Sequence, residues 1–286
     1  MKFMVLADVH QSEKHWQLLY EAVCDEKPDL VAIAGDLLPK YDGILAQLSF
    51  LPALKEYASA IRNKGAELVL ILGNDDNHLA IPEMEKGDQQ NLWHYVSDRV
   101  KKVSGWEICG CPWISDYPFA YKYWVAVESK DQSAISPLQL GPPATISSKN
   151  EIETIPDLEA YLKAKPSINQ SLEKMAGQVK NISNSIWLIH GPPTKMDFDL
   201  CGSGDRVGSP AVYNFIAEKQ PLLTTHGHIH EAPALNGGVW VKKLGRTVCI
   251  QAGQSFEELN YAIFNLNEGK IENLEHSIYG KYRDEL

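Results

Sequence analysis

Apolar runs alternate with amphipathic stretches over the first part of the chain. Short runs rich in apolar and β-branched residues are separated by stretches with apolar positions at helical spacing, in the order strand, helix, strand, helix, strand. The five segments are residues 2–9, 13–26, 28–38, 44–65 and 66–74. This alternation is typical of βαβ units, in which helices cover a sheet that is buried on both faces. The N-terminal part is therefore predicted to be α/β.

The second half of the chain repeats this pattern and then departs from it. Residues 185–191 and 221–228 are apolar runs that end in polar residues, with a helical stretch at 211–220 between them. Residues 237–253 and 258–276 instead have the turn residues and short apolar runs of β-hairpins. We therefore predict an α/β (α+β) fold in which a second, mixed sheet closes a sandwich.

The segment from 113 to 182 follows neither pattern. It begins with aromatic residues, continues through a loop rich in Pro, Ser and Gly, and ends in a helical stretch that Pro166 interrupts. A connection of this length is usually functional or separately folded. We predict a single domain over residues 1–286 that carries an inserted cap or extension at 113–182.

Composition and charge narrow the classes of function. The chain has 286 residues, of which 44% are hydrophobic and 22% charged, and its formal net charge is -10. Because no Lys/Arg cluster is present to neutralise phosphates, nucleic acid is an unlikely partner. No apolar run approaches the ~18 residues of a membrane span. The five cysteines are scattered, which indicates reduced thiols, and an acidic residue comes too early for a secretory signal, so we expect a cytoplasmic protein.

Residues able to bind metal ions follow five of the apolar runs. Ligands of open α/β sheets bind at the carboxyl ends of strands, so side chains at these positions are expected to meet. Each one alone has an ordinary structural explanation, such as a helix cap for an Asp, but their ordered recurrence favours a metal site. The residues in question are Asp8 and His10, Asp36, Asn74 and Asp75, His190, and His226, His228 and His230.

Together these motifs resemble those of the calcineurin-like metallophosphoesterases. The order is D-x-H, G-D, G-N followed by an acidic residue, an isolated His before G-P-P, and G-H-x-H, from Asp8 to His230. The resemblance implies two mixed β-sheets packed face to face, flanked by helices, and a two-metal centre. Carried over by position, it assigns Asp8, His10 and His230 to the first ion, Asp36 to both ions as a bridge, and Asn74, His190 and His228 to the second.

The implied chemistry is phosphate ester hydrolysis. Carboxylate, amide and imidazole donors suit two divalent ions such as Mn²⁺, Fe, Zn²⁺ or Mg²⁺. Two ions ~3.5–4 Å apart lower the pKa of a shared water and orient a phosphate, which makes a metal-bridging hydroxide the expected nucleophile. The substrate would be a small or medium phosphate ester, and the enzyme a phosphomonoesterase, phosphodiesterase or nucleotide pyrophosphohydrolase. The alternative is a non-catalytic metal-binding scaffold or interaction protein of the same fold.

The stretch after the third strand departs from the family pattern. Family members commonly have a His after the Gly-Asn pair, which contacts the phosphate and can protonate the leaving group, followed by an acidic residue that orients it. This chain has Asp75 and Asp76 at these two positions. Three interpretations are open for the general acid. Asp75 acts in its protonated form, with its pKa raised by burial or by Asp76; His78 supplies the imidazole, with Asp75 or Asp76 as its partner; or the leaving group needs no proton.

Two further groups are candidates for substrate binding. Arg206 lies in a glycine-rich stretch at 199–209 and can bind a phosphate through two hydrogen bonds, unless it pairs with Asp205 or faces solvent. Together with Asn74, whose other explanation is a simple turn, it forms the set of candidate substrate-binding residues. An aromatic group either stacks a nucleobase or packs within the insertion; its members are Trp113, Tyr117, Phe119, Tyr121, Tyr123 and Trp124.

Overall fold

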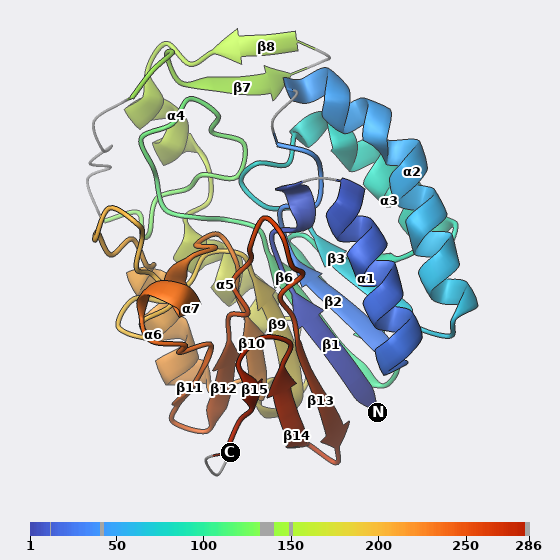
Figure 1. Cartoon of the computed structure of the whole chain (residues 1–286). Helices are drawn as coiled ribbons and strands as arrows, with labels where there is room; N and C mark the ends of the chain where they lie inside the picture. Colours follow the sequence, from blue (N-terminus) through green and yellow to red (C-terminus); the bar gives the residue numbers. More distant parts are fainter. Residues whose placement is uncertain (12, 41–42, 132–139, 149–150, 284–286) are drawn as a thin grey trace.

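Two β-sheets lie face to face, and helices cover their outer faces (Figure 1). The computed structural model describes residues 1–11, 13–40, 43–131, 140–148 and 151–283. The two large sheets are mixed, so the predicted sandwich flanked by helices is confirmed. Among the described residues, no helix is both long and apolar enough to cross a bilayer.

The first sheet has the strand order β15-β14-β13-β1-β2-β3-β4. Strands β1 to β4 are parallel to one another, and β13, β14 and β15 are added antiparallel along the β1 edge. The bounds are β1 Lys2–Leu6, β2 Leu30–Ala34, β3 Glu67–Ile71, β4 His94–Tyr95, β13 Ala262–Asn267, β14 Lys270–His276 and β15 Gly280–Lys281.

The second sheet has the order β11-β12-β10-β9-β6-β5. Its four central strands, β6, β9, β10 and β12, are parallel, and its two edge strands are antiparallel to their neighbours. The bounds are β5 Arg99–Val103, β6 Trp106–Cys111, β9 Ser185–Ile189, β10 Leu223–Thr225, β11 Val241–Leu244 and β12 Thr247–Ile250.

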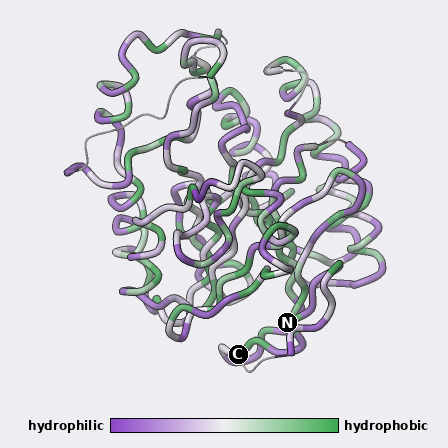
Figure 2. The backbone as a smooth tube through the Cα atoms, turned by 60° about the vertical axis from the view of Figure 1, so that its left-hand side comes forward, coloured by the Kyte–Doolittle hydropathy of each residue, from purple (hydrophilic) through white to green (hydrophobic). Residues whose placement is uncertain are grey.

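The continuous apolar runs of the sequence are explained by burial of the central strands on both faces. In β1, Phe3 and Val5 belong to the cluster between the sheets, whereas Met4 and Leu6 belong to the cluster under the helices. Successive side chains of a strand point to opposite faces, so a strand covered on both sides has no polar position. Figure 2 shows the same distribution, with hydrophobic segments gathered in the interior.

Helices close the outer faces of both sheets. In α1, Trp16, Leu19 and Val23 recur at helical spacing and are all buried, while on the other side Phe215 of α6 contacts Trp187 of β9 with ring centroids 4.6 Å apart. The bounds are α1 Glu13–Glu26, α2 Gly43–Asn63, α3 Ile81–Gln89, α4 Leu158–Ala164, α5 Ile168–Ala176, α6 Pro210–Lys219 and α7 Ala232–Leu235, with the 3-10 turns η1 Val9–Gln11, η2 His78–Ala80 and η3 Ile182–Asn184.

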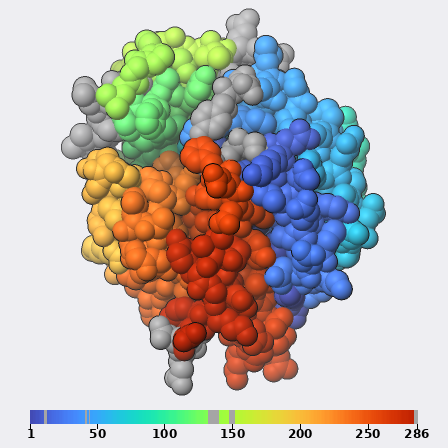
Figure 3. Space-filling view, viewed as in Figure 1, coloured from blue at the N-terminus to red at the C-terminus, as the bar shows by residue number. Residues whose placement is uncertain are grey.

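The segment between β6 and β9 has two parts. A hairpin of β7 Thr145–Ser148 and β8 Glu151–Thr154, together with α4, forms the green lobe at the top of Figure 3, and a small cluster of its own includes Val125 and Leu162. Helix α5, however, buries Leu172 and Met175 in the main core. We propose that the inserted part of 113–182 ends before α5, because α5 belongs to the layer over the second sheet.

The two sheets approach so closely at one position of β6 that only glycine fits there. A Cβ on Gly110 would lie 2.4 Å from Ile71 Cγ2 and 2.5 Å from the backbone oxygen of Val96. We therefore expect Gly110→Ala to lower the free energy of unfolding by about 1–3 kcal/mol through overpacking, measured by urea denaturation. Gly177→Ala is the control, since its Cβ would meet atoms only at 3.6 Å. Equal stability of the two variants would contradict this account of the sheet contact.

Candidate metal centre

The parallel strands of both sheets end at one rim of the sandwich, at the upper ends of the two sheets and below the β7–β8 hairpin in Figure 1. The residues predicted to bind metal follow these ends directly: β1, β2 and β3 supply one part of the group, and β9 and β10 of the opposite sheet supply the other. All seven side chains are wholly or largely buried there. They are Asp8, His10, Asp36, Asn74, His190, His228 and His230.

Four of these residues form one group around a common point. Asp8, His10, Asp36 and His230 each offer a ligand atom, and these atoms lie within 4.8 Å of one another. The Nε2 atoms of His10 and His230 are 3.1 Å apart, and His230 Nε2 is 3.6 Å from Asp8 Oδ1. A buried set of two carboxylates and two imidazoles is able to hold a divalent ion.

A second group lies on the other side of Asp36. Asn74 Oδ1 is 2.8 Å from His190 Nε2 and 2.6 Å from His228 Nδ1. Asp36 Oδ2 lies 3.5 Å from His190 Nε2 and 3.9 Å from His10 Nε2. One carboxylate oxygen therefore lies between the two groups.

The backbone at the strand ends adopts an uncommon conformation to place these side chains. Asp8, Asp36 and His228 have φ angles of 59°, 54° and 70°, in the left-handed region that residues with a Cβ seldom occupy. Gly73 lets the chain pass close to the site, because a Cβ there would lie 2.3 Å from Asp36 Oδ1. Strained conformations that gather in one place are typical of functional sites.

Asp36 and His190 form a buried pair of opposite charge whose pKa values shift in opposite directions. Burial alone would raise the pKa of Asp36, but the charges of His190 and His10 outweigh it and lower that pKa. Burial would likewise lower the pKa of His190, yet Asp36 and Asp8 raise it to about 9. His228 is different, since burial and the neighbouring His190 lower its pKa to about 3.

An unpartnered carboxylate oxygen of Asp8 also indicates that these residues fit a metal ion. Asp8 Oδ2 is fully buried and accepts no hydrogen bond from any residue that the structure describes. A buried carboxylate oxygen without a partner is costly, and a cation supplies the missing partner. The other oxygen, Asp8 Oδ1, accepts a hydrogen bond from the backbone N–H of His228 at 3.1 Å.

Asp76 joins two loops, and none of the hydrogen bonds described for its side chain involves His78. Its carboxylate accepts the backbone N–H groups of Leu37, Leu38 and Gly73 at 2.8–3.0 Å. Burial and the charge of Asp36 raise the pKa of Asp76, and these hydrogen bonds act in the opposite direction. The described contacts give Asp76 a structural role, joining the end of β2 to the end of β3.

His78 lies in an aromatic environment outside the two ligand groups. Its ring is 4.6 Å from the ring of Trp124 and 5.7 Å from that of Tyr123. Burial, and then the charge of Lys165, lower the pKa of His78 to about 4, so the imidazole is neutral at pH 7. The structure does not bring His78 together with the metal-capable residues.

Asp75, by contrast, lies beside the first ligand group. Its Oδ2 is 3.6 Å from His10 Nδ1 and 2.7 Å from Lys40 Nζ. Its backbone N–H donates to Asp36 Oδ1 at 2.9 Å, and its Oδ1 accepts from Asn74 Nδ2 at 3.0 Å. An acidic side chain paired with a cation thus occupies the place where the family pattern has an imidazole.

The remaining candidates have other partners. Arg206 pairs with Asp197 and Asp199, at 2.9 and 3.0 Å, which are not the partners considered from sequence. His226 contacts Thr224 Oγ1 at 2.8 Å and backbone oxygens of β9 and the following loop. Neither side chain is among the two ligand groups.

Tyr117 belongs to the site and was not singled out by the sequence. Its ring centroid is 6.1 Å from that of His228, and its hydroxyl donates to the backbone oxygen of Tyr121 at 2.5 Å. Burial, followed by the charges of Asp75 and Asp36, raises the pKa of Tyr117 well above its usual range. The only sequence signal was its membership of the aromatic group at the start of the insertion.

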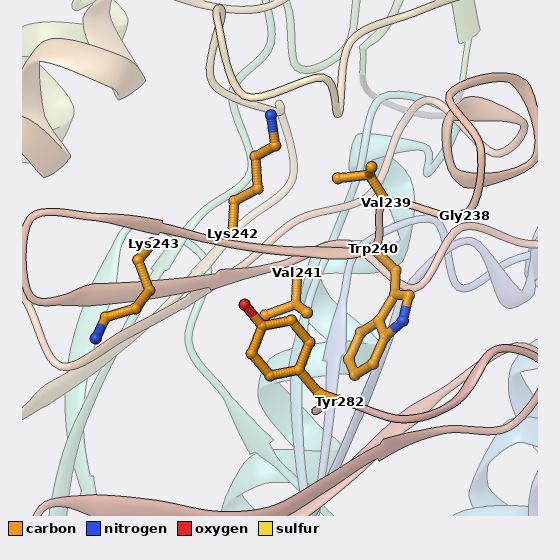
Figure 4. Close-up of a pocket in the computed structure, with 7 residues that line it drawn as sticks. All are labelled: Gly238, Val239, Trp240, Val241, Lys242, Lys243 and Tyr282. Atoms are coloured by element: carbon orange, nitrogen blue, oxygen red, sulfur yellow. The ribbon is translucent and has the colours of Figure 1, made fainter. Parts of the chain in front are cut away.

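A separate pocket lies at the β11 edge of the second sheet, and none of its lining residues belongs to the two ligand groups (Figure 4). Trp240 and Tyr282 face each other there with ring centroids 6.1 Å apart, and Lys242 is paired with Asp197 at 2.5 Å. Its lining contains no carboxylate or imidazole, so it lacks metal ligands. The lining residues are Gly238, Val239, Trp240, Val241, Lys242, Lys243 and Tyr282.

Comparison with known proteins identifies the family. The family model described as calcineurin-like phosphoesterase matches residues 1–232. The chain belongs to the calcineurin-like phosphoesterase family. This membership suggests a metal-dependent phosphoester hydrolase, and the group around Asp8, His10, Asp36 and His230 is able to hold a metal ion.

Two solved structures share the fold of this chain. One crystal structure is 16% identical with a TM-score of 0.60, and the match covers 96% of this chain and 98% of the other. The crystal structure of TT1561 of Thermus thermophilus is 14% identical with a TM-score of 0.57, covering 96% of this chain and 97% of the other. No curated protein matches the chain significantly.

The contacts of Asp76 predict a stability effect separate from metal binding. Asp76→Ala would leave the amides of Leu37, Leu38 and Gly73 without their acceptor, at about 1–3 kcal/mol for each buried group. We expect a loss of at least ~3 kcal/mol in urea unfolding of metal-free protein. Asp75→Ala breaks a single ion pair with the partly exposed Lys40 and should cost about 1 kcal/mol or less. If both variants lose the same stability, Asp76 does not join the loops as described.

Proposed function

We propose that the protein is a dinuclear-metal phosphoesterase that hydrolyses a small or medium phosphate ester. The observation that supports two ions is the position of Asp36 Oδ2, within 3.9 Å of a nitrogen in each ligand group. Asp8, His10 and His230 would hold one ion, Asn74, His190 and His228 the other, and Asp36 both. Donors of this kind, without thiolate, suit Mn²⁺, Fe, Zn²⁺ or Mg²⁺.

The ions, Asp36 and Asn74 would have separate roles in catalysis. Two bound divalent ions would lower the pKa of a water molecule and stabilise negative charge on the phosphoryl group. Asp36 would fix the spacing of the two ligand groups, and its contact with the backbone of Asp75 holds the loop after β3 in register. Asn74 would bind through its amide oxygen, since its Nδ2 already donates to Asp75.

Replacement of Asp36 tests the shared ligand. Asp36→Asn should weaken binding of both ions by at least about tenfold. Even changes to residues that only contact metal ligands typically weaken metal binding by about 10–100-fold. Asn74→Ala should weaken only one of them. Metal content per chain after equilibrium dialysis against Mn²⁺ separates the two outcomes. An Asn74→Ala protein that binds both ions with wild-type affinity would mean that Asn74 is only a turn residue.

The lack of an imidazole after Asn74 predicts a selective activity. His78 is neutral at pH 7 and packs on Trp124 outside the ligand groups, so we expect that it does not supply a proton to the leaving group. General acid catalysis typically contributes about 10²–10⁴-fold, and its loss affects only leaving groups of high pKa. Aryl phosphates, aryl phosphodiesters and phosphoanhydrides should therefore be hydrolysed far faster than alkyl phosphates.

A panel of these esters, with Mn²⁺ added back to metal-stripped protein, tests the activity. We expect a steep fall of kcat/KM with leaving-group pKa, unchanged by His78→Ala. Equal rates for alkyl and aryl esters would contradict the absence of a general acid. Two bound ions without turnover of any ester would instead favour the non-catalytic scaffold of the same fold.

A further inference from the structure

A lysine occupies the mouth of the candidate metal centre. Lys40 Nζ lies 2.7 Å from Asp75 Oδ2, and the Lys40 side chain is 42% exposed while that of Asp75 is 12% exposed. Asp75 Oδ2 is in turn 3.6 Å from His10 Nδ1 of the first ligand group. A cation thus lies close to the first ligand group, with part of its surface open to solvent.

The loops around the site hold this lysine in place. The amides of Leu37 and Leu38, just before it, are fixed on Asp76, and the backbone N–H of Lys40 donates to the oxygen of His10 at 3.2 Å. Asp75 is equally fixed, because Gln47 Nε2 donates to its backbone oxygen at 2.7 Å. Both partners of the ion pair are therefore held by backbone contacts.

The charge balance of the site calls for a cation at this place. Two divalent ions would offset the charges of Asp8 and Asp36, whereas Asp75 is assigned to neither ion and stands where family members have an imidazole. Asp75 alone would repel the phosphate. A lysine ammonium has three N–H donors and binds phosphate as a point charge, so one ammonium can contact Asp75 and an anion at the same time.

We propose that Lys40 binds a phosphate oxygen of the substrate, and that Asp75 is the residue that positions it. The pair takes over the phosphate-binding role of the missing imidazole, without its proton-donating role. This inference rests on the proposed function, because the phosphate is placed by the metal ions. The competing explanation is that the pair only ties the loop after β2 to the loop after β3.

The test is binding of inorganic phosphate to Mn²⁺-loaded protein, measured by isothermal titration calorimetry without turnover. A charge-assisted hydrogen bond contributes about 1.5–3 kcal/mol, so Lys40→Met should weaken phosphate binding by about 10–100-fold with unchanged Mn²⁺ content. Lys40→Arg should recover part of the affinity, because it keeps the charge. In an Asp75→Asn background the effect of Lys40→Met should shrink, since the lysine is no longer positioned.

Lys2→Met is the matched control. Lys2 pairs with Glu26 at 2.9 Å, its side chain is 35% exposed, and it lies at the opposite end of β1 from the site. It should leave phosphate affinity unchanged. Wild-type and Lys40→Met proteins that bind phosphate within twofold of each other would overturn the role of Lys40 alone. No phosphate binding by the Mn²⁺-loaded wild type would contradict both this role and the proposed function.

Discussion

Burial of the Asp36 carboxylate at the ends of parallel strands is the constraint on which the site depends. A negative charge removed from water is tolerated only when cations or hydrogen-bond donors surround it. Here His190 lies 3.5 Å and His10 3.9 Å from one oxygen, and the Asp75 amide donates to the other. Because these partners follow β1, β3 and β9, the carboxylate links both sheets at their common rim.

Two adjacent aspartates after β3 have separate tasks. Asp76 points inward and accepts amides from two loops, whereas Asp75 points toward His10 and Lys40. Of these two consecutive residues, one therefore has a structural carboxylate and the other has a carboxylate at the mouth of the site. Hydrogen bonds to Gln47, Asp36 and Asp76 hold the loop after β3, and within this loop Asp75 stands where the family pattern has an imidazole.

The sequence was sufficient for what depends on periodicity and topology. Apolar runs without polar positions predicted strands buried on both faces, and parallel strands with polar ends predicted that Asp8, Asp36 and His190 would meet, as they do. Contacts that depend on loop conformation could not be read from it. Asp76 binds amides 38 and 39 residues away, His78 packs on Trp124 of the insertion, and Lys40 reaches Asp75.

The metal assignments themselves remain predictions, and one measurement tests them most directly. Anomalous diffraction from crystals of Mn²⁺-loaded protein should give two peaks about 3.5–4 Å apart, with Asp36 Oδ2 between them and Asn74 Oδ1 directed at the second. A single peak among Asp8, His10 and His230, with Asn74 Oδ1 still hydrogen-bonded to His190 and His228, would contradict the two-metal account.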